Sequence, residues 1–348
     1  MGTMPDILKL ADDIAQKSGL VLGKDGRGGS GTCVRLDNGD LALLTAKHVV
    51  VDCLLTGELS IARSSDKCTD LPKRIRMDST QMGDAAYVVL RRQDGKAPAI
   101  PFSQWTQNTQ KLGTGAFGLA SGFPGELRKP INKICQALCA LRRLFGATVK
   151  QAIIPRHMFF QTAISRTSSD LVVCSIDERI KGFPTTLRGM SGGSLFTLDG
   201  DFVGVLIEER RKLTPVSGEL DVLLPGAFTE LYTPFQPPPG SPTDYWGQQA
   251  WSPVFNIVHM NDKKRKAKIQ VSAELFWSEK SRASQYGRMG RISFFTFIIP
   301  GFKQQYPVNT EALFYWDEDT EAAKLKALHE AIVFLLLRSE WGIDTPAT

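Results

Sequence analysis

Short apolar runs separated by turn residues recur between residues 20 and 233, and they constrain the fold more than any other feature. Residues 32–36 and 41–45 are two such runs, joined by Asp37-Asn38-Gly39-Asp40. An Asn/Asp/Gly connection between apolar runs is a strong β-hairpin signal. Further strands are predicted at residues 59–63, 85–91, 116–121, 158–164, 171–176, 194–198 and 202–207. This stretch is therefore expected to be mainly β, with Gly28-Gly29-Ser30-Gly31 as a loop.

The chain of 348 residues exceeds one ordinary core, so two or three domains are expected. A proline-rich stretch at 234–245 predicts a stiff linker, and the α+β pattern after it predicts a separate module. The predicted organisation is an N-terminal helix at 1–19, a first β part at 20–125, a basic amphipathic helical connection at 126–152, a second β part at 153–233, the linker at 234–245 and a C-terminal α+β module of unknown role at 246–348.

Composition and charge indicate a globular protein and do not favour general nucleic-acid binding. Hydrophobic residues make up 42% of the chain and charged residues 22%, which is too apolar for a disordered protein. The net charge is +6, but residues 126–156 alone carry seven Lys/Arg against one Glu, so the basic character is local. Residues 128–156 and 263–268 remain the alternative places for a nucleic acid to bind.

A basic amphipathic helix is predicted at residues 130–146. Such a helix can rest on an anionic membrane surface, which is one interpretation. We favour the other, in which the helix covers a groove on its own protein, because its apolar face is short.

The six cysteines are expected to be reduced thiols in a cytoplasmic protein. They form neither a CxxC pair nor a Cys/His set with zinc spacing, so no metal site is predicted. The N-terminus has no apolar segment followed by a small-residue cleavage site, so no secretory signal is expected. A disulfide between Cys33 and Cys53 is the alternative.

A serine lies between glycines in Gly189-Met190-Ser191-Gly192-Gly193, directly before an apolar run. Gly189 can adopt the backbone angles of a nucleophile turn because it has no Cβ to clash. In that geometry the N–H groups of Gly189 and Ser191 point at one place, where a carbonyl oxygen could gain negative charge. Ser191 is thus a candidate nucleophile, and it needs a base within hydrogen-bond reach.

The candidate base is His48, which follows an apolar strand and is expected to lie where that strand gives way to a loop. Asp84 begins the apolar run 84–90, where an ionised carboxylate needs a partner. The imidazole N–H of His48 is a suitable partner for this carboxylate. The hydrogen bond between them would fix the His48 tautomer whose other nitrogen accepts the serine proton. The aspartates that compete for this role are Asp52, Asp70 and Asp78. The histidines assigned to packing or to the surface are His157, His259 and His329.

These segments resemble the motifs of the trypsin-like (chymotrypsin-fold) serine peptidases. Residues 45–48 resemble the family's Thr-Ala-Ala-His block, residues 84–88 its Asp-Ile-Ala-Leu block, and residues 189–193 its Gly-Asp-Ser-Gly-Gly block. The resemblance covers roughly residues 20–235. It implies two antiparallel six-stranded β-barrels, the first with His48 and Asp84 and the second with Ser191. It implies a serine endopeptidase that needs no cofactor.

Met190 departs from this pattern, because the digestive enzymes carry there an Asp that pairs with a freshly cut N-terminus. The resemblance is therefore to the non-zymogen branch, intracellular bacterial or viral. Without that pairing, other contacts must hold the oxyanion hole.

The resemblance also suggests where a substrate side chain would bind. It places Thr185 at the floor of the specificity pocket, and this small neutral residue does not support a demand for Lys or Arg. Ile207, Glu208 and Glu209 follow the strand that would pair with the substrate backbone. We expect Glu209 to narrow the pocket and favour a small or medium apolar side chain. The alternative is that Glu208 or Glu209 turns inward and holds a basic side chain.

The expected partner is a protein or peptide substrate, with residues 246–348 as a candidate site for a regulatory partner. The alternative function is a catalytically silent trypsin-like scaffold that binds peptides or partner proteins.

Overall fold

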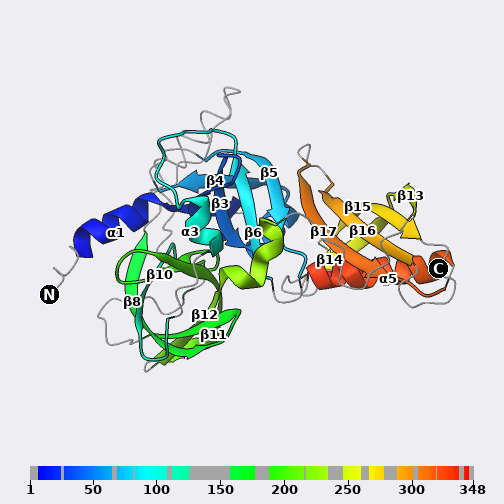
Figure 1. Ribbon diagram of the computed structural model, residues 1–348. Helices are drawn as coiled ribbons and strands as arrows, with labels where there is room; N and C mark the ends of the chain where they lie inside the picture. Colours follow the sequence, from blue (N-terminus) through cyan, green and yellow to red (C-terminus); the bar gives the residue numbers. More distant parts are fainter. Residues whose placement is uncertain are drawn as a thin grey trace. The chain divides into compact units, whose positions relative to one another are not determined.

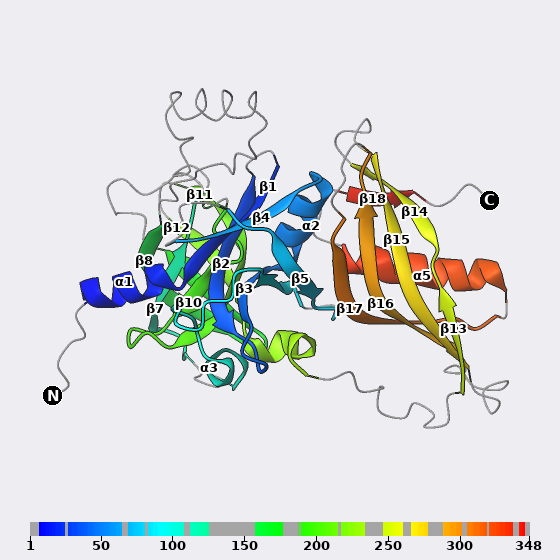
Figure 2. The same ribbon diagram turned by 90° about the horizontal axis from the view of Figure 1, so that it is seen from above.

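The computed structural model consists of separate strands and helices that can be followed in Figures 1 and 2. It describes residues 7–24, 27–64, 69–80, 83–107, 112–124, 157–176, 187, 189–214, 217–233, 246–259, 266–277, 288–300, 305–318, 320–336 and 341–344. Within these ranges, only the backbone is described at 7, 208–214, 217, 246–248, 259, 277 and 341–344. The predicted connection at 126–152, with its helix at 130–146, lies outside the described residues, as does the linker at 234–245.

The chain separates into two compact units. Unit 1 contains Met1–Lys73 and Asp84–Phe228, and unit 2 contains Arg74–Gly83 and Thr229–Thr348. The three candidate catalytic residues all belong to unit 1.

The first sheet of unit 1 is an antiparallel half-barrel with the strand order β4-β1-β2-β3-β6. Its strands are β1 (Ser18–Gly23), β2 (Gly28–Arg35), β3 (Leu41–Ala46), β4 (Leu59–Arg63) and β6 (Ala85–Leu90). Beyond β4 the chain bends back, and Ile61 and Asp70 exchange backbone hydrogen bonds of 2.8 and 2.6 Å. The β2–β3 hairpin predicted from the Asn-Gly turn is confirmed.

The expected loop at residues 28–31 is instead the start of β2. The glycines allow it, because the strand passes close to its neighbours. A Cβ at Gly31 would lie 2.5 Å from Cγ of Leu43, and one at Gly29 would lie 2.5 Å from the carbonyl oxygen of Ser191. The helices described in this part of the chain are α1 (Ile7–Gln16), α2 (Lys47–Leu55) and α3 (Phe102–Gln107).

The second sheet of unit 1 is a closed six-stranded barrel with the order β10-β11-β12-β9-β8-β7. Its strands are β7 (Phe117–Gly122), β8 (Met158–Thr167), β9 (Leu171–Ile176), β10 (Ser194–Phe196), β11 (Phe202–Thr214) and β12 (Ser217–Leu223), followed by the 3-10 helix η2 (Pro225–Leu231). All pairs are antiparallel, and pairing of β10 with β7 closes the barrel. The core of this barrel includes Leu195, Val222 and Cys174, each fully or almost fully buried.

The described part of unit 2 is a mainly antiparallel sheet with a helix on it. Its strands are β5 (Pro72–Met77, from Arg74 on), β13 (Trp246–Trp251), β14 (Val254–His259), β15 (Lys266–Trp277), β16 (Arg288–Ile298), β17 (Pro307–Tyr315) and β18 (Trp341–Asp344), and its helix is α5 (Glu321–Leu335). Figure 2 shows α5 along one face of the sheet. Leu328, Ile332 and Leu335 form its buried stripe, and Thr320 caps its start by accepting the N–H of Ala323 at 3.1 Å.

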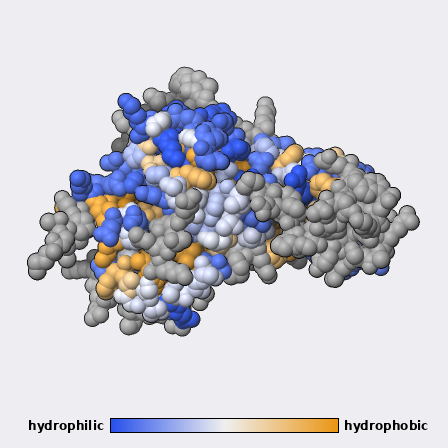
Figure 3. Space-filling view, in the orientation of Figure 1, coloured by the Kyte–Doolittle hydropathy of each residue, from blue (hydrophilic) through white to orange (hydrophobic). Residues whose placement is uncertain are grey.

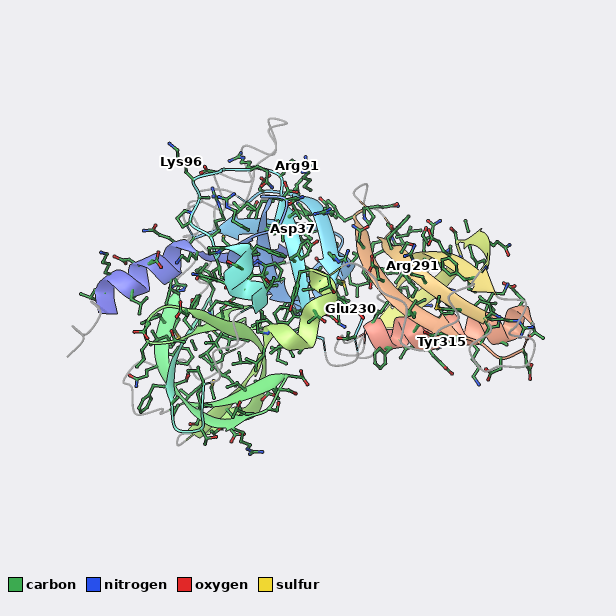
Figure 4. The ribbon with its side chains drawn as sticks, in the orientation of Figure 1. Asp37, Arg91, Lys96, Glu230, Arg291 and Tyr315 are labelled. Atoms are coloured by element: carbon green, nitrogen blue, oxygen red, sulfur yellow. The ribbon has the colours of Figure 1, made fainter. Side chains whose placement is uncertain are left out.

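Strand β5 joins unit 2 by pairing in parallel with β17. The amide of Asn309 donates to the carbonyl of Ile75 at 3.1 Å, and Arg76 forms an ion pair with Glu311 at 3.4 Å. Figure 4 labels Arg291 on β16 and Tyr315 on β17, which are neighbouring strands of the same sheet.

The predicted fold class is confirmed: the chain is mainly β, with a closed barrel, a half-barrel sheet and a C-terminal α+β part. This architecture is consistent with a chymotrypsin-like double barrel. Cys33, Cys53 and Cys174 are buried free thiols, so the alternative Cys33–Cys53 disulfide is not formed. No helix among the described residues is long and apolar enough to cross a membrane.

The visible face of unit 1 divides by polarity (Figure 3). Hydrophilic side chains gather at the end of the first sheet where Figure 4 labels Asp37, Arg91 and Lys96. Hydrophobic side chains gather over β8 and β10.

Candidate active site

His48 lies on the first turn of α2, so the prediction of a loop at this position is wrong. β3 ends at Ala46, and α2 begins at once with Lys47. Asp84 holds the start of this helix: its carbonyl accepts the N–H of Lys47 at 3.1 Å, and its Oδ1 accepts the N–H of His48 at 3.0 Å. A carboxylate at a helix N-terminus is favoured by the helix dipole. The helix continues because residues 49–51 and 53–55 are buried.

The same carboxylate binds the imidazole of His48. Oδ2 of Asp84 lies 2.7 Å from Nδ1 of His48. The Asp84 side chain is 3% exposed and that of His48 18% exposed, so the pair is shielded while the ring keeps access to solvent. An ionised carboxylate only accepts hydrogen bonds, so Nδ1 is the protonated nitrogen. Nε2 is then left as the hydrogen-bond acceptor of the neutral ring.

Register explains why these two residues meet. Strands β3 and β6 are antiparallel neighbours, and Ala46 pairs with Ala85. Lys47, the residue after β3, therefore lies beside Asp84, the residue before β6, and His48 is the next residue along the chain. Two of the competing aspartates have other contacts: Asp70 accepts from the N–H of Leu71 at 2.9 Å, and Asp78, in unit 2, accepts from the N–H of Thr80 at 2.7 Å.

Ser191 lies in a tight turn between glycines that both have left-handed backbone angles. Gly189 has φ of +92° and Gly192 has φ of +86°, values that favour glycine. Within the turn, the N–H of Gly193 donates to the carbonyl of Met190 at 2.8 Å. The N–H of Gly192 donates to Leu206 of β11 at 2.6 Å, which fixes the turn on the barrel.

This turn lies against the end of β3 and the start of α2. A Cβ at Gly192 would lie 2.1 Å from Oγ1 of Thr45 and 3.0 Å from the backbone N of Ala46, so there is room only for glycine. A Cβ at Gly29 would lie 2.5 Å from both the carbonyl oxygen of Ser191 and Cγ2 of Val49. The Ser191 segment thus borders residues on both sides of His48.

Met190 points into the apolar core of the second barrel. It is 1% exposed and belongs to the same buried cluster as Leu187 and Leu195. Its side chain therefore stabilises the turn by packing, and its thioether is at best a weak hydrogen-bond acceptor.

The predicted substrate-binding residues are described only in part. Thr185 lies outside the described residues. Ile207 is 2% exposed and sits in β11. Glu208 and Glu209 are described by their backbone alone, which pairs with Asp221 and Leu220 of β12.

A contact between a histidine and two serines occurs elsewhere in unit 1, at His157. Nε2 of His157 lies 2.8 Å from Oγ of Ser121 and 3.2 Å from Oγ of Ser18, and its ring forms a T-shaped contact with the ring of Phe123. Both serines are 1% exposed, so neither hydroxyl is open to a substrate. Burial lowers the pKa of His157 from 6.5 to about 4, so this ring is neutral at pH 7.

Stability should depend on pH through His157. His157 takes up a proton near pH 6.5 in the unfolded chain but only near pH 4 in the folded protein. Its contribution to the free energy of unfolding is therefore complete above pH 6.5 and decreases as the pH drops toward 4. The difference corresponds to about 3 kcal/mol. In urea unfolding between pH 7.5 and 4, His157→Asn should show a flatter pH dependence than wild type. Parallel curves for the two proteins would refute this assignment.

No group of three or more His, Cys, Asp or Glu side chains in the described part of the chain is arranged to hold a metal ion.

Comparison with known proteins gives only distant likenesses. No family model matches the sequence, and no curated protein matches it. Among solved structures, the active form of the Rv3671c protease from M. tuberculosis is 16% identical, with a TM-score of 0.42 over 67% of this chain and 88% of that one. The serine endoprotease from Yersinia pestis is 16% identical, with a TM-score of 0.41 over 66% of this chain and 65% of that one.

A Glu endopeptidase in complex with MPD is also 16% identical, with a TM-score of 0.41 over 62% of this chain and 88% of that one. Likenesses at this level do not assign an activity to this chain.

Proposed function

We propose that this protein is a trypsin-like serine endopeptidase that cleaves peptide bonds through an acyl-enzyme intermediate. The observation that carries the proposal is the 2.7 Å contact between Asp84 and His48, beside the glycine-flanked turn of Ser191. A buried carboxylate that orients a partly exposed imidazole is the arrangement that a serine nucleophile needs.

Each residue has a role in this mechanism. Ser191 Oγ attacks the peptide carbonyl while Nε2 of His48 takes the hydroxyl proton. Asp84 keeps Nδ1 protonated and stabilises the imidazolium that forms. The N–H groups of Gly189 and Ser191 bind the oxygen that becomes negative. His48 then passes the proton to the leaving amine, and water releases the acyl group by the same steps in reverse.

Met190 supports assignment to the non-zymogen branch, because a buried methionine cannot pair with a cleaved N-terminus. For specificity, we retain a pocket with Thr185 at its floor that accepts small or medium apolar side chains, with Ile207, Glu208 and Glu209 along the substrate. Residues 246–348 are proposed to bind a regulatory partner. The buried free thiols of Cys33, Cys53 and Cys174 support a cytoplasmic setting.

A fluorophosphonate probe tests the function directly, because it reacts only with a serine activated by its base. The native protein should be labelled with one probe per chain, and peptide mapping should place the adduct on Ser191. Unfolding in urea should abolish labelling, because the three residues come from distant segments. A folded protein that takes no label and cleaves no peptide would instead support the silent scaffold.

A further inference from the structure

Ser30, in β2, has a hydroxyl that the proposed mechanism does not use. The residue is 0% exposed. Its Oγ donates a hydrogen bond to the carbonyl of Gly189 at 2.6 Å and accepts one from the N–H of Phe123 at 2.7 Å. Since the hydroxyl is bound on both sides, its direction is fixed, and it holds the Gly189 carbonyl in one position.

The main chain of Ser30 holds the other side of the same turn. Its N–H donates to the carbonyl of Ser191 at 2.8 Å. Its own carbonyl accepts the hydroxyl of Thr45 at 2.6 Å, which fixes the Ser30 backbone. One residue of the first sheet thus binds two carbonyl groups that flank Met190.

The N–H of Ser191, a proposed oxyanion donor, lies between the carbonyl groups of Gly189 and Ser191 along the chain. It belongs to the Met190–Ser191 peptide, whose carbonyl accepts the N–H of Gly193 at 2.8 Å. The described peptide bonds are all trans, so the Ser191 N–H points away from that carbonyl. The direction of this N–H depends on the two neighbouring peptide groups, Gly189–Met190 and Ser191–Gly192. Ser30 binds the carbonyl of each of them.

The turn at residues 189–193 has no charged side chain that could hold these peptide groups in place. Met190, at its centre, is buried in an apolar cluster. The hydrogen bond from Ser30 Oγ to Gly189 therefore supplies the polar anchor that the methionine cannot. Oxyanion donors are effective because they are held in place before the reaction begins.

We propose that the Ser30 hydroxyl is a positioning residue for the oxyanion hole, joining the first sheet to the nucleophile turn. This inference rests on the proposed function. It predicts a loss in the chemical step and not in substrate binding, because Ser30 is buried behind the turn.

The test compares Ser30→Ala with Thr32→Val. Thr32 lies on the same strand, is also buried, and bonds through Oγ1 to Oγ of Ser194 in the second barrel at 2.6 Å. It makes no described contact with residues 189–193, so it controls for the loss of a buried hydroxyl bond between the two sheets. Rates are divided by the concentration of molecules that a fluorophosphonate labels, which removes any unfolded fraction from the comparison.

Ser30→Ala should lower kcat by about ten- to a hundredfold, less than the 10²–10³ lost with a donor itself, while KM changes less than twofold. Affinity for a peptide aldehyde, which forms a tetrahedral adduct, should fall by the same factor. Thr32→Val should keep kcat within about twofold. A labelled Ser30→Ala enzyme with wild-type kcat would overturn the inference, and so would equal losses in both variants.

Ser30→Cys and Ser30→Thr keep the test decisive if the alanine variant does not fold. The thiol is a weak donor and should give a smaller but clear loss of kcat, whereas threonine keeps the hydroxyl and should retain most activity. Wild-type kcat in Ser30→Cys would reject the role of the hydroxyl. If wild type neither takes the label nor turns over peptide, the proposed function fails, and this inference fails with it.

Discussion

Ser191→Ala is expected to lower kcat for peptide cleavage by about 10⁶-fold, with KM nearly unchanged. The variant loses the attacking oxygen, while the N–H groups of Gly189 and Ser191 remain to bind the substrate oxygen. A residual acceleration of about 10³–10⁴ over the uncatalysed reaction is therefore expected. The carbonyl of residue 191 still accepts the N–H of Ser30, so thermal stability should change little.

Single-turnover assays with a chromogenic peptide measure this loss, and Ser175→Ala is a matched control. Ser175 lies in β9 of the same barrel, where its hydroxyl donates to the carbonyl of Ala163 at 3.2 Å. Its replacement should leave kcat within about twofold. A Ser191→Ala enzyme that kept more than a tenth of wild-type kcat would show that another group is the nucleophile.

Asp84→Asn is expected to lower kcat by about 10⁴-fold. An asparagine amide would donate to Nδ1 of His48, so the ring would carry its proton on Nε2 and could not accept one from Ser191. The asparagine can still accept the N–H of His48 through its side-chain oxygen and that of Lys47 through its carbonyl. The start of α2 should therefore survive, and the loss should appear in kcat.

Asp70→Asn separates this effect from a general loss of charge. Asp70 was a competing candidate, and its carboxylate accepts from backbone N–H groups, as in its 2.9 Å bond with Leu71. Its replacement should leave kcat within about twofold, with circular dichroism confirming the fold of both variants. Equal activity of the two variants would remove Asp84 from the proposed triad.

The sequence carried enough information to predict several strands of the second barrel and to single out the candidate site residues. Hairpin signals such as Asp199-Gly200 lie between short apolar runs, and the structure forms the β10–β11 hairpin there. His48, Asp84 and Ser191 were identified because each lies at a boundary between an apolar run and a polar or glycine-rich segment. Whether they act as a triad remains a proposal.

Other features could not be predicted, for physical reasons. Residues 41–55 form one nearly continuous apolar run, so periodicity does not show where β3 ends and α2 begins. The cap that starts α2 comes from Asp84, 36 positions later. Ser30 looked like a loop residue because its glycine neighbours are loop signals, whereas here they allow close approach. Its contact with Gly189 spans 159 positions, which no local pattern reports.

The contacts between the Ser191 turn and the first sheet have a consequence during protein synthesis. A ribosome-bound chain that has released only the first sheet holds the imidazole and the carboxylate but no attacking group. A chain released through the turn still needs residues 29–49 docked against it before that group is anchored. Under the proposed function, polypeptides that end before the Ser191 turn, or whose turn has not yet docked against the first sheet, would therefore lack hydrolytic activity.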